Sequence, residues 1–481
     1  MDPSGLVRGH KSNLQLLKPV LRAYALGYLS STTPKVISSF RCLRRKELGY
    51  KEKLQEIVRA VTCTIRLNSF PSFCAFLVGG STISPILLLR LCDLVARRLD
   101  SKANVFKSQS FVRFVRFTTA FLSSLLSLQL LNQKPINLQT TSRNVSDDAQ
   151  NNGKAQDPRE FAGRTMDLTL FTFTRAIDAL VCLAWSTWCR RRKTQGRLTW
   201  AETVAPQLAD AGAFAASSAI VMWAWFYLPE RLPRSYGKWI GEIARVDSRL
   251  IEALRRARRG QFVYGKDTGQ APLLESMCRD YNWPLEWGSP AKTFPIPCQM
   301  VHMDCGPNCE FHAFMRFVRT LKVACATYIP LQLVFRFRAL KSRQSVVRAL
   351  TDALRSSAFL SAFVTLFYYS VCLARTRLGP KLFDQKTVTR QMWDSGLCVG
   401  AGCIMCGWSI LVEKPRKRQE LALFVAPRAA ATVLPRVYPK KYQNREYATF
   451  ATSAAIIFTC LQERPNMIRG VFGKIANGVL K

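Results

Sequence analysis

Long apolar runs separated by stretches rich in arginine and lysine form the main pattern of this chain. Five runs contain no charged residue and have about the length of a membrane span: 67–89, 117–133, 211–229, 356–374 and 395–412. A helix that crosses the hydrocarbon core needs about 20 apolar residues. In lipid only helices and closed barrels satisfy their backbone polar groups, and these runs are too long and continuous for barrel strands. The pattern therefore predicts an all-α, polytopic membrane helix bundle.

An ordered series of similar segments predicts that the bundle consists of two repeated halves. The segment RTMDLTLFTFTRAIDAL, from residue 164, aligns with KRQELALFVAPRAAATV, from residue 417. Further along, FAASSAI from residue 214 aligns with FATSAAI from residue 450. Shorter matches before and after these segments occur in the same order, which indicates a duplication.

The repeat gives a predicted domain organisation. Residues 1–245 form the first membrane repeat, and its polar insert, 134–163, is predicted to be disordered because it is rich in Asn, Gln, Ser and Asp. Residues 246–311 form a basic linker that contains Cys and His, and 312–481 form the second membrane repeat. Each half offers about five helical segments, and we expect eight to ten membrane spans.

The charge balance is strongly basic, with 70 Lys and Arg against 31 Asp and Glu, a formal net charge of +39. Basic clusters such as 189–193 and 255–259 flank apolar segments, where they bind anionic lipid and help to set topology. We expect the lipid bilayer, anionic lipids and possible protein partners as ligands. Nucleic acid is not expected, because such binders rarely contain long uncharged runs.

The first residues lack the apolar core and cleavage site of a secretory signal. We therefore expect an organelle membrane reached from the cytosol. The 16 cysteines are scattered, mostly through apolar segments, and would risk mispairing in an oxidising lumen.

The segment CQMVHMDCGPNCEFH, at 298–312, concentrates soft metal ligands. Cys298, His302, Cys305, Cys309 and His312 are enough for a tetrahedral zinc, and Cys278 is a possible addition. The spacing is not that of a standard zinc knuckle. A disulfide between Cys305 and Cys309 and a compact loop with free thiols are the alternatives.

Charged residues inside apolar segments are candidate functional positions, since a charge in lipid is costly unless it is paired or hydrated. Arg175 and Arg428 hold equivalent repeat positions. Each either reaches the headgroup level or lines a polar cavity. Asp178 can pair with Arg175 along the helix, and Asp210 is a possible partner from another helix.

Small residues at spacings of three or four predict a face for close helix packing. In the second half these are Gly396, Gly400, Cys403 and Gly407, and in the first half Thr119, Ser123 and Ser127. We find no phosphate-binding glycine loop, HExxH or GxSxG, and expect no enzymatic activity.

Two segments carry a resemblance to a known family. GWSILVEKPRKRQELALFVAPRA, at 407–429, resembles the C-terminal part of the transmembrane protein 135 family, and 298–336 resembles that family's Cys-rich segment. The resemblance implies a multi-pass protein of peroxisomal or mitochondrial membranes, linked to lipid metabolism and organelle dynamics. It also implies similarity to the mitochondrial translocase channel family.

We therefore expect a transport- or pore-like protein of the peroxisomal membrane, or alternatively of a mitochondrial one. The other functional hypothesis is a scaffold without transport activity, which recruits partners or lipids through its basic loops and its Cys/His segment.

Overall fold

The computed structural model describes residues 13–43, 58, 62, 65–98, 108–133, 161–197, 199–336, 342–384, 386–435 and 437–480. Within these ranges the regular secondary structure is helical apart from one pair of two-residue strands, which confirms the predicted all-α fold class. Contacts divide the chain into two compact units. Unit 1 contains residues 1–198 and 435–481, and unit 2 contains residues 199–434.

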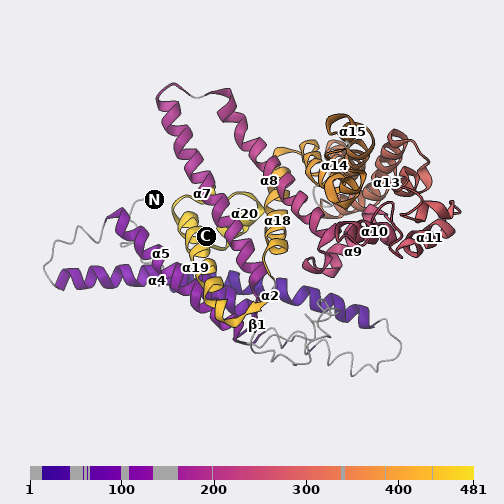
Figure 1. Cartoon of the computed structure of the whole chain (residues 1–481). Coiled ribbons are helices and arrows are strands. Elements are labelled where there is room, and N and C mark those ends of the chain that lie inside the picture. Colours follow the sequence, from indigo (N-terminus) through magenta and orange to yellow (C-terminus); the bar gives the residue numbers. More distant parts are fainter. Residues whose placement is uncertain are drawn as a thin grey trace. The chain divides into compact units, whose positions relative to one another are not determined.

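Unit 1 is a bundle of long helices. Its elements are α2 (Asn13–Leu43), α4 (Phe70–Arg98), α5 (Gln109–Asn132), β1 (Phe161–Ala162), α7 (Met166–Thr194), β2 (Tyr438–Pro439), η10 (Lys440–Tyr442), α19 (Gln443–Glu463), η11 (Pro465–Met467) and α20 (Gly470–Leu480). Helix α4 packs against α2 and α5, and α19 packs against α5 and α7 (Figure 1). Phe73, Leu128 and Phe450 fill the core between these helices.

A buried carboxylate anchors α19 to the start of α7. Glu446 is 6% exposed and accepts hydrogen bonds from the hydroxyls of Thr165 (2.6 Å), Thr169 (3.2 Å) and Tyr438. The antiparallel strands β1 and β2 pair beside it. A buried carboxylate is tolerated here because three donors satisfy its oxygens.

Unit 2 holds more and shorter elements. They are α8 (Trp200–Tyr227), η3 (Pro229–Arg231), α9 (Arg234–Ala244), α10 (Ser248–Arg258), α11 (Ala271–Asp280), η4 (Leu285–Gly288), α12 (Cys298–His302), η5 (Met303–Cys305), α13 (Cys309–Phe335), α14 (Arg343–Cys372), η7 (Leu373–Arg377), α15 (Leu378–Leu382), α16 (Arg390–Met392), η8 (Trp393–Leu397), α17 (Cys398–Cys406), η9 (Gly407–Val412) and α18 (Pro415–Val433). Here α14 packs against α13, and α8 packs against α18 (Figure 1). Helix α17 packs against both α14 and α8.

Each unit contains one long helix that was predicted to belong to the other half of the chain. The first half was expected to include α8 and the second α19, but α8 packs within unit 2 and α19 within unit 1. The unit boundaries therefore differ from the predicted boundaries at 245 and 311. Of the polar insert, 134–160 lies outside the described residues, and Phe161 and Ala162 form β1.

Six described helical segments are long and apolar enough to cross a membrane, fewer than the eight to ten expected. They are Phe70–Val95, Gln109–Asn132, Met166–Thr194, Trp200–Tyr227, Arg343–Leu382 and Arg390–Val412. Their number and length fit a multi-pass membrane protein. Charged residues along α2, α13, α18 and α19 lower the mean hydropathy of these helices.

Candidate metal centre

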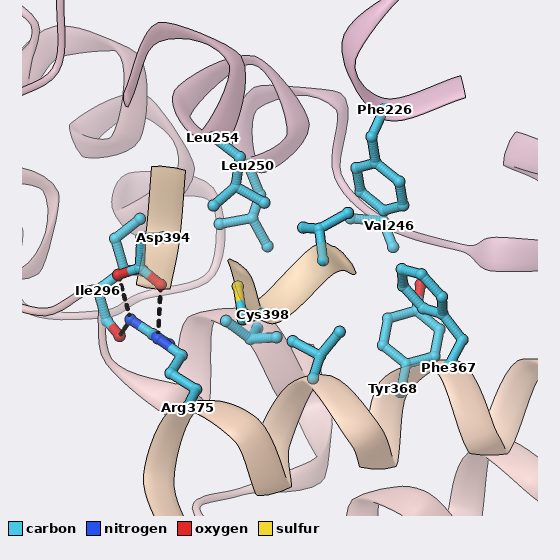
Figure 2. Close-up of a pocket in the computed structure, with 13 residues that line it drawn as sticks. Phe226, Val246, Leu250, Leu254, Ile296, Phe367, Tyr368, Arg375, Asp394 and Cys398 are labelled. Atoms are coloured by element: carbon cyan, nitrogen blue, oxygen red, sulfur yellow. Dashed lines mark hydrogen bonds and ion pairs between the residues drawn. The ribbon is translucent and has the colours of Figure 1, made fainter. Parts of the chain in front are cut away.

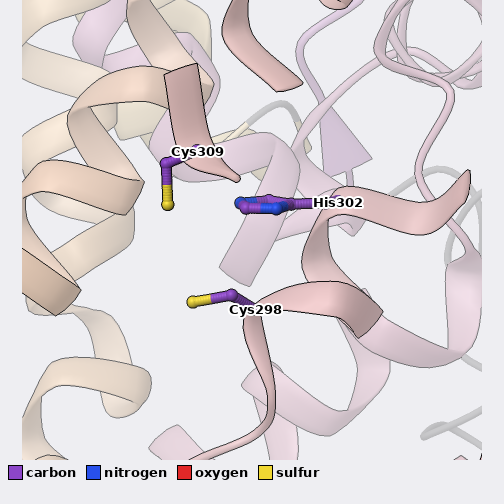
Figure 3. A group of neighbouring side chains, drawn as sticks. All are labelled: Cys298, His302 and Cys309. Carbon is purple, nitrogen blue, oxygen red and sulfur yellow. The ribbon is translucent and has the colours of Figure 1, made fainter. Parts of the chain in front are cut away.

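Three side chains of the linker converge on one point in unit 2. Cys298 and His302 are the first and last residues of α12, and one helical turn brings them to the same face. Cys309 is the first residue of α13. The ligand atoms of all three lie within 4.8 Å of one another. Figure 3 shows both thiols turned toward the space beside the His302 ring. This group can hold a metal ion.

A sharp turn between His302 and Cys309 brings the chain back to the group. Gly306 has a φ of 70°, in the left-handed region that glycine occupies without steric cost. The Asn308 side chain then accepts hydrogen bonds from the backbone N–H of Glu310 (2.9 Å) and Phe311 (3.1 Å). This cap starts α13 immediately before Cys309 and so fixes the position of its thiol.

The His302 ring has one nitrogen fixed by a backbone contact. Its Nδ1 lies 2.9 Å from the Gly306 carbonyl oxygen, which only accepts, so Nδ1 carries the hydrogen. Burial also lowers the pKa of His302 and keeps the ring neutral. Nε2 is left with its lone pair, as a metal-ligating histidine requires.

A cysteine that sequence reasoning missed faces that lone pair. Cys372, the last residue of α14, has its Sγ 3.3 Å from His302 Nε2 and is 5% exposed. In the sequence it ends an apolar run, where a cysteine is expected to pack as a small hydrophobe. No spacing signal connects it with the linker.

The other predicted ligands lie outside the group. Cys305 and Cys309 are both free thiols, and Cys305 is buried. Cys278 lies on α11, in a core that also contains Leu274, Met277 and Met300. His312 is fully buried, and its ring stacks on that of His302 at a centroid distance of 4.3 Å. The group therefore unites residues 298, 302 and 309 of the five that were predicted.

His312 belongs to an aromatic and basic cluster behind His302. Burial and the neighbouring Arg316 guanidinium lower the pKa of His312 to about 3, so the ring is neutral at physiological pH. Arg316 lies over the Tyr368 ring (4.4 Å to the centroid) and donates to the Ala244 carbonyl oxygen at 2.6 Å. The Tyr368 hydroxyl donates to the same oxygen at 2.8 Å. These contacts hold the C-terminal carbonyl of α9 against α13 and α14.

A buried ion pair, also missed in the sequence, lies near this Cys/His group. Arg375 Nε is 2.7 Å from Asp394 Oδ1, and Nη2 donates to Oδ2 at 2.9 Å. Figure 2 shows Arg375 pointing at Asp394 and at the Ile296 carbonyl, to which Nη2 donates at 2.5 Å. Tyr264 donates to Asp394 Oδ2 at 2.5 Å, and burial together with the Asp394 charge raises the pKa of Tyr264 well above its usual range.

Both partners of this pair come from π-helical turns, η7 and η8. Such local widening of a helix re-aims side chains and is frequent at functional sites. Here it turns two charged side chains toward each other at the ends of apolar helices. The Arg375–Asp394 pair connects α14, η8 and the linker that contains Tyr264 and Ile296.

The two repeat-equivalent arginines have different surroundings. In unit 1, Arg175 is 6% exposed, between the rings of Phe171 (5.3 Å) and Phe472 (5.5 Å). Asp178 forms an ion pair with Arg469, which connects α7 with the segment before α20. In unit 2, Arg428 is half-buried. Arg175 is therefore buried against two aromatic rings, whereas Arg428 is partly exposed.

Arg428 lies on α18 and Asp210 on α8, both in unit 2. Arg428 Nη1 donates to the Phe424 carbonyl at 2.6 Å, and its guanidinium covers the Phe424 ring at 3.6 Å. Asp210 is half-buried in the first half of its helix.

The small residues of 396–407 border α8. A Cβ at Gly407 would lie 2.4 Å from the Ala215 Cα, so two backbones approach closely there. Gly400 faces Trp223, and Cys403 is 2% exposed. Gly396 has a φ of 152°, and a Cβ there would meet Arg258 at 2.7 Å. In unit 1, Ser123 has a similar role, because a Cβ at Gly80 would lie 2.3 Å from its Cβ.

An apolar pocket of about 320 Å³ lies among α8, α9, α13, α14 and α18. Trp225, Trp239, Phe359 and Phe363 form much of its wall. Its polar groups include the hydroxyls of Ser218, Tyr236 and Tyr328. A volume of this size and a lining with few polar groups are typical of small-molecule sites.

In comparisons with known proteins, no family model, no curated protein and no solved structure matches this chain.

Proposed function

We propose that this chain is a multi-pass protein of the peroxisomal membrane, or alternatively of a mitochondrial membrane, that binds and moves anionic lipids. The resemblance of 298–336 and 407–429 to the transmembrane protein 135 family supports the organelle and the connection to lipid metabolism and organelle dynamics. The six apolar helices support a position in a bilayer, because their length and composition suit a membrane span. Purification of peroxisomes and mitochondria, followed by detection of the full chain, tests the location.

The observation that carries the proposal is the position of Arg428 beside the apolar pocket. Phe424 and Tyr236 line this pocket, and Arg428 contacts Phe424. Burial raises the pKa of Tyr236 and the Arg428 charge opposes this rise, so the guanidinium is also close to Tyr236. An acyl chain fits the apolar wall, while the guanidinium suits a phosphate or carboxylate headgroup.

The repeat supports a transport role. Helices α4, α5, α7 and α19 of unit 1 have the same neighbour relations as α14, α17, α18 and α8 of unit 2. In addition, η11 and α20 follow α19 as η3 and α9 follow α8, with the same lengths. Repeated halves commonly frame a substrate path in transporters.

Reconstituted vesicles test lipid binding and flux together. We expect the variant R428Q to lower both photo-crosslinking of an anionic acyl-lipid probe to unit 2 and transfer of that lipid between leaflets, by about tenfold or more. Loss of one charge-assisted hydrogen bond costs about 1.5–3 kcal/mol, and about 1.4 kcal/mol is a factor of ten. R416Q, at an exposed arginine of the same helix, is the matched control.

Equal crosslinking and transfer in R428Q and R416Q would reject the site. If R428Q lowers crosslinking but the wild type transfers no lipid between leaflets, the transport role is rejected and the lipid-binding site is retained.

A second candidate function is a lipid- or partner-recruiting scaffold, and the basic end of α7 favours it. Arg190, Arg191 and Lys193 are exposed near the C-terminal end of this helix. Exposed cations near a membrane attract anionic lipids with about 1 kcal/mol each. Glutamine at all three positions should weaken recruitment of the chain's partners, or of anionic vesicles, without a change in lipid transfer.

The metal that best suits Cys298, His302 and Cys309 is zinc, because thiolate and imidazole are the ligands of structural zinc sites. Burial raises the pKa of the Cys298 thiol, and a bound zinc would offset this by stabilising the thiolate. Metal analysis of the purified full chain tests for zinc.

A further inference from the structure

We propose that Cys372 is the fourth ligand of a closed Cys₃His zinc site, which fastens the linker to the end of α14. The inference rests on the zinc assignment above and is independent of lipid transport. It adds a ligand from a candidate membrane span to three ligands from the linker.

The distance between Cys372 and His302 fits a tetrahedral site. With zinc bonds of about 2.3 Å to sulfur and about 2.0 Å to nitrogen, ligand atoms lie roughly 3.5–3.8 Å apart. Cys372 Sγ is 3.3 Å from His302 Nε2. The Cys309 thiol lies next to both the Cys298 and the Cys372 thiols. Three donors therefore lie within 4.8 Å of one another, and Cys372 Sγ already has the spacing of a fourth ligand to His302 Nε2.

The His302 ring is oriented for this role. Its Nδ1–H donates to the Gly306 carbonyl, and this contact directs the Nε2 lone pair toward Cys372. A hydrogen bond from the second nitrogen to a backbone carbonyl is the usual support of a zinc-binding histidine. The stacked His312 ring holds the plane of His302 from behind.

The charges around the site are also suitable. A zinc ion with three thiolates and a neutral imidazole carries one net negative charge. The Arg375 guanidinium acts on both the Cys298 and the Cys372 thiols, although its partner Asp394 opposes it at Cys298, and Arg316 acts on His302. Positive neighbours offset a buried negative centre, which would otherwise be costly.

The chain topology explains why distant residues meet here. Helices α13 and α14 are consecutive and pack against each other, so they run antiparallel. Cys309 begins α13 and Cys372 ends α14, which places both at the same end of this helix pair. Four protein ligands leave no open position, so the zinc would be structural and not catalytic.

Cobalt substitution and metal analysis of the full chain in detergent test the assignment. We expect stoichiometric zinc in the wild type, and a cobalt charge-transfer band whose intensity corresponds to three thiolates. C372S should lower the intensity to that of two thiolates and weaken metal affinity by more than about 100-fold. Loss of a side chain that only hydrogen-bonds to a metal ligand costs about 10–100-fold. C305S, at a buried cysteine of the same linker, should behave as wild type.

A second measurement does not depend on the folding of variants. In the wild type, zinc should protect Cys298, Cys309 and Cys372 from alkylation, and a chelator should expose all three together. Two results would overturn Cys372 as the fourth ligand but keep the zinc assignment. One is an unchanged cobalt charge-transfer band in C372S that still binds metal, and the other is alkylation of Cys372 in the zinc-bound wild type. Metal-free protein, or a Cys298–Cys309 disulfide in its place, would overturn both.

Discussion

Replacement of Asp394 by asparagine should strongly destabilise unit 2. The Asp394 side chain is 2% exposed and that of its partner Arg375 is 7% exposed. Asparagine has nearly the same shape, so D394N removes the charge and creates no cavity. The Arg375 guanidinium then remains buried without its counter-charge.

The structure indicates the magnitude. Two contacts, at 2.7 and 2.9 Å, join the guanidinium to both carboxylate oxygens, and Tyr264 donates to one of them. Loss of one partner of a buried ion pair costs about 3–5 kcal/mol. For a domain of 150–250 residues, 1 kcal/mol shifts the melting temperature by about 2–4 °C. D394N should therefore melt about 6–20 °C below the wild type.

Thermal unfolding in detergent with a thiol-reactive dye measures this effect. The free cysteines Cys398, Cys403 and Cys406 are at most 2% exposed, so the dye reacts as unit 2 opens. The control is D280N, which removes one partner of an exposed ion pair with Arg249. Exposed pairs contribute about 0–1 kcal/mol.

The double variant R375M/D394L completes the test. It removes both charges, and replacement of a buried pair by apolar residues is often neutral or stabilising. We expect R375M/D394L to be more stable than D394N. Equal melting of D394N and D280N, or a double variant less stable than D394N, would refute the reasoning.

Two further predictions use the same assay. G407A should lower the free energy of unfolding by about 1–3 kcal/mol, because its methyl group would overlap the Ala215 backbone. A methyl group at Gly212 meets nothing within 4 Å, so G212A should stabilise its helix by about 0.4–1 kcal/mol. Equal melting temperatures of the two variants would contradict this prediction. Burial favours a higher pKa for Asp247, but hydrogen bonds from the Arg249 side chain and backbone outweigh it and lower the pKa. The Asp247 contribution to stability is therefore present above its unfolded pKa of about 3.9 and is lost as the pH falls through the lower folded pKa. As the pH falls over this range, D247N should lose less stability than the wild type. Equal losses in the two proteins would count against this prediction.

The sequence by itself determined the elements and part of the metal group. Uncharged runs such as 67–89 and 356–374 become helices because length and apolarity are local properties that need no partner. Cys298 and His302 are four residues apart, so one helical turn brings them together wherever the linker lies. Local geometry also explains Cys309, which follows the turn at Gly306 and the cap at Asn308.

Only the tertiary structure decided which elements meet. Within an apolar run, many faces are equally able to pack, so nothing in the sequence assigns α8 to the helices of unit 2 or α19 to those of unit 1. For the same reason Cys372 resembles any buried cysteine until α14 packs against α13 and brings its thiol to His302. The Arg375–Asp394 pair depends on two π-helical turns whose side chains meet only in the folded bundle. The spacing of residues along the chain determines which side chains are neighbours over one or two helical turns. Over longer separations, the packing of the helices determines which side chains meet.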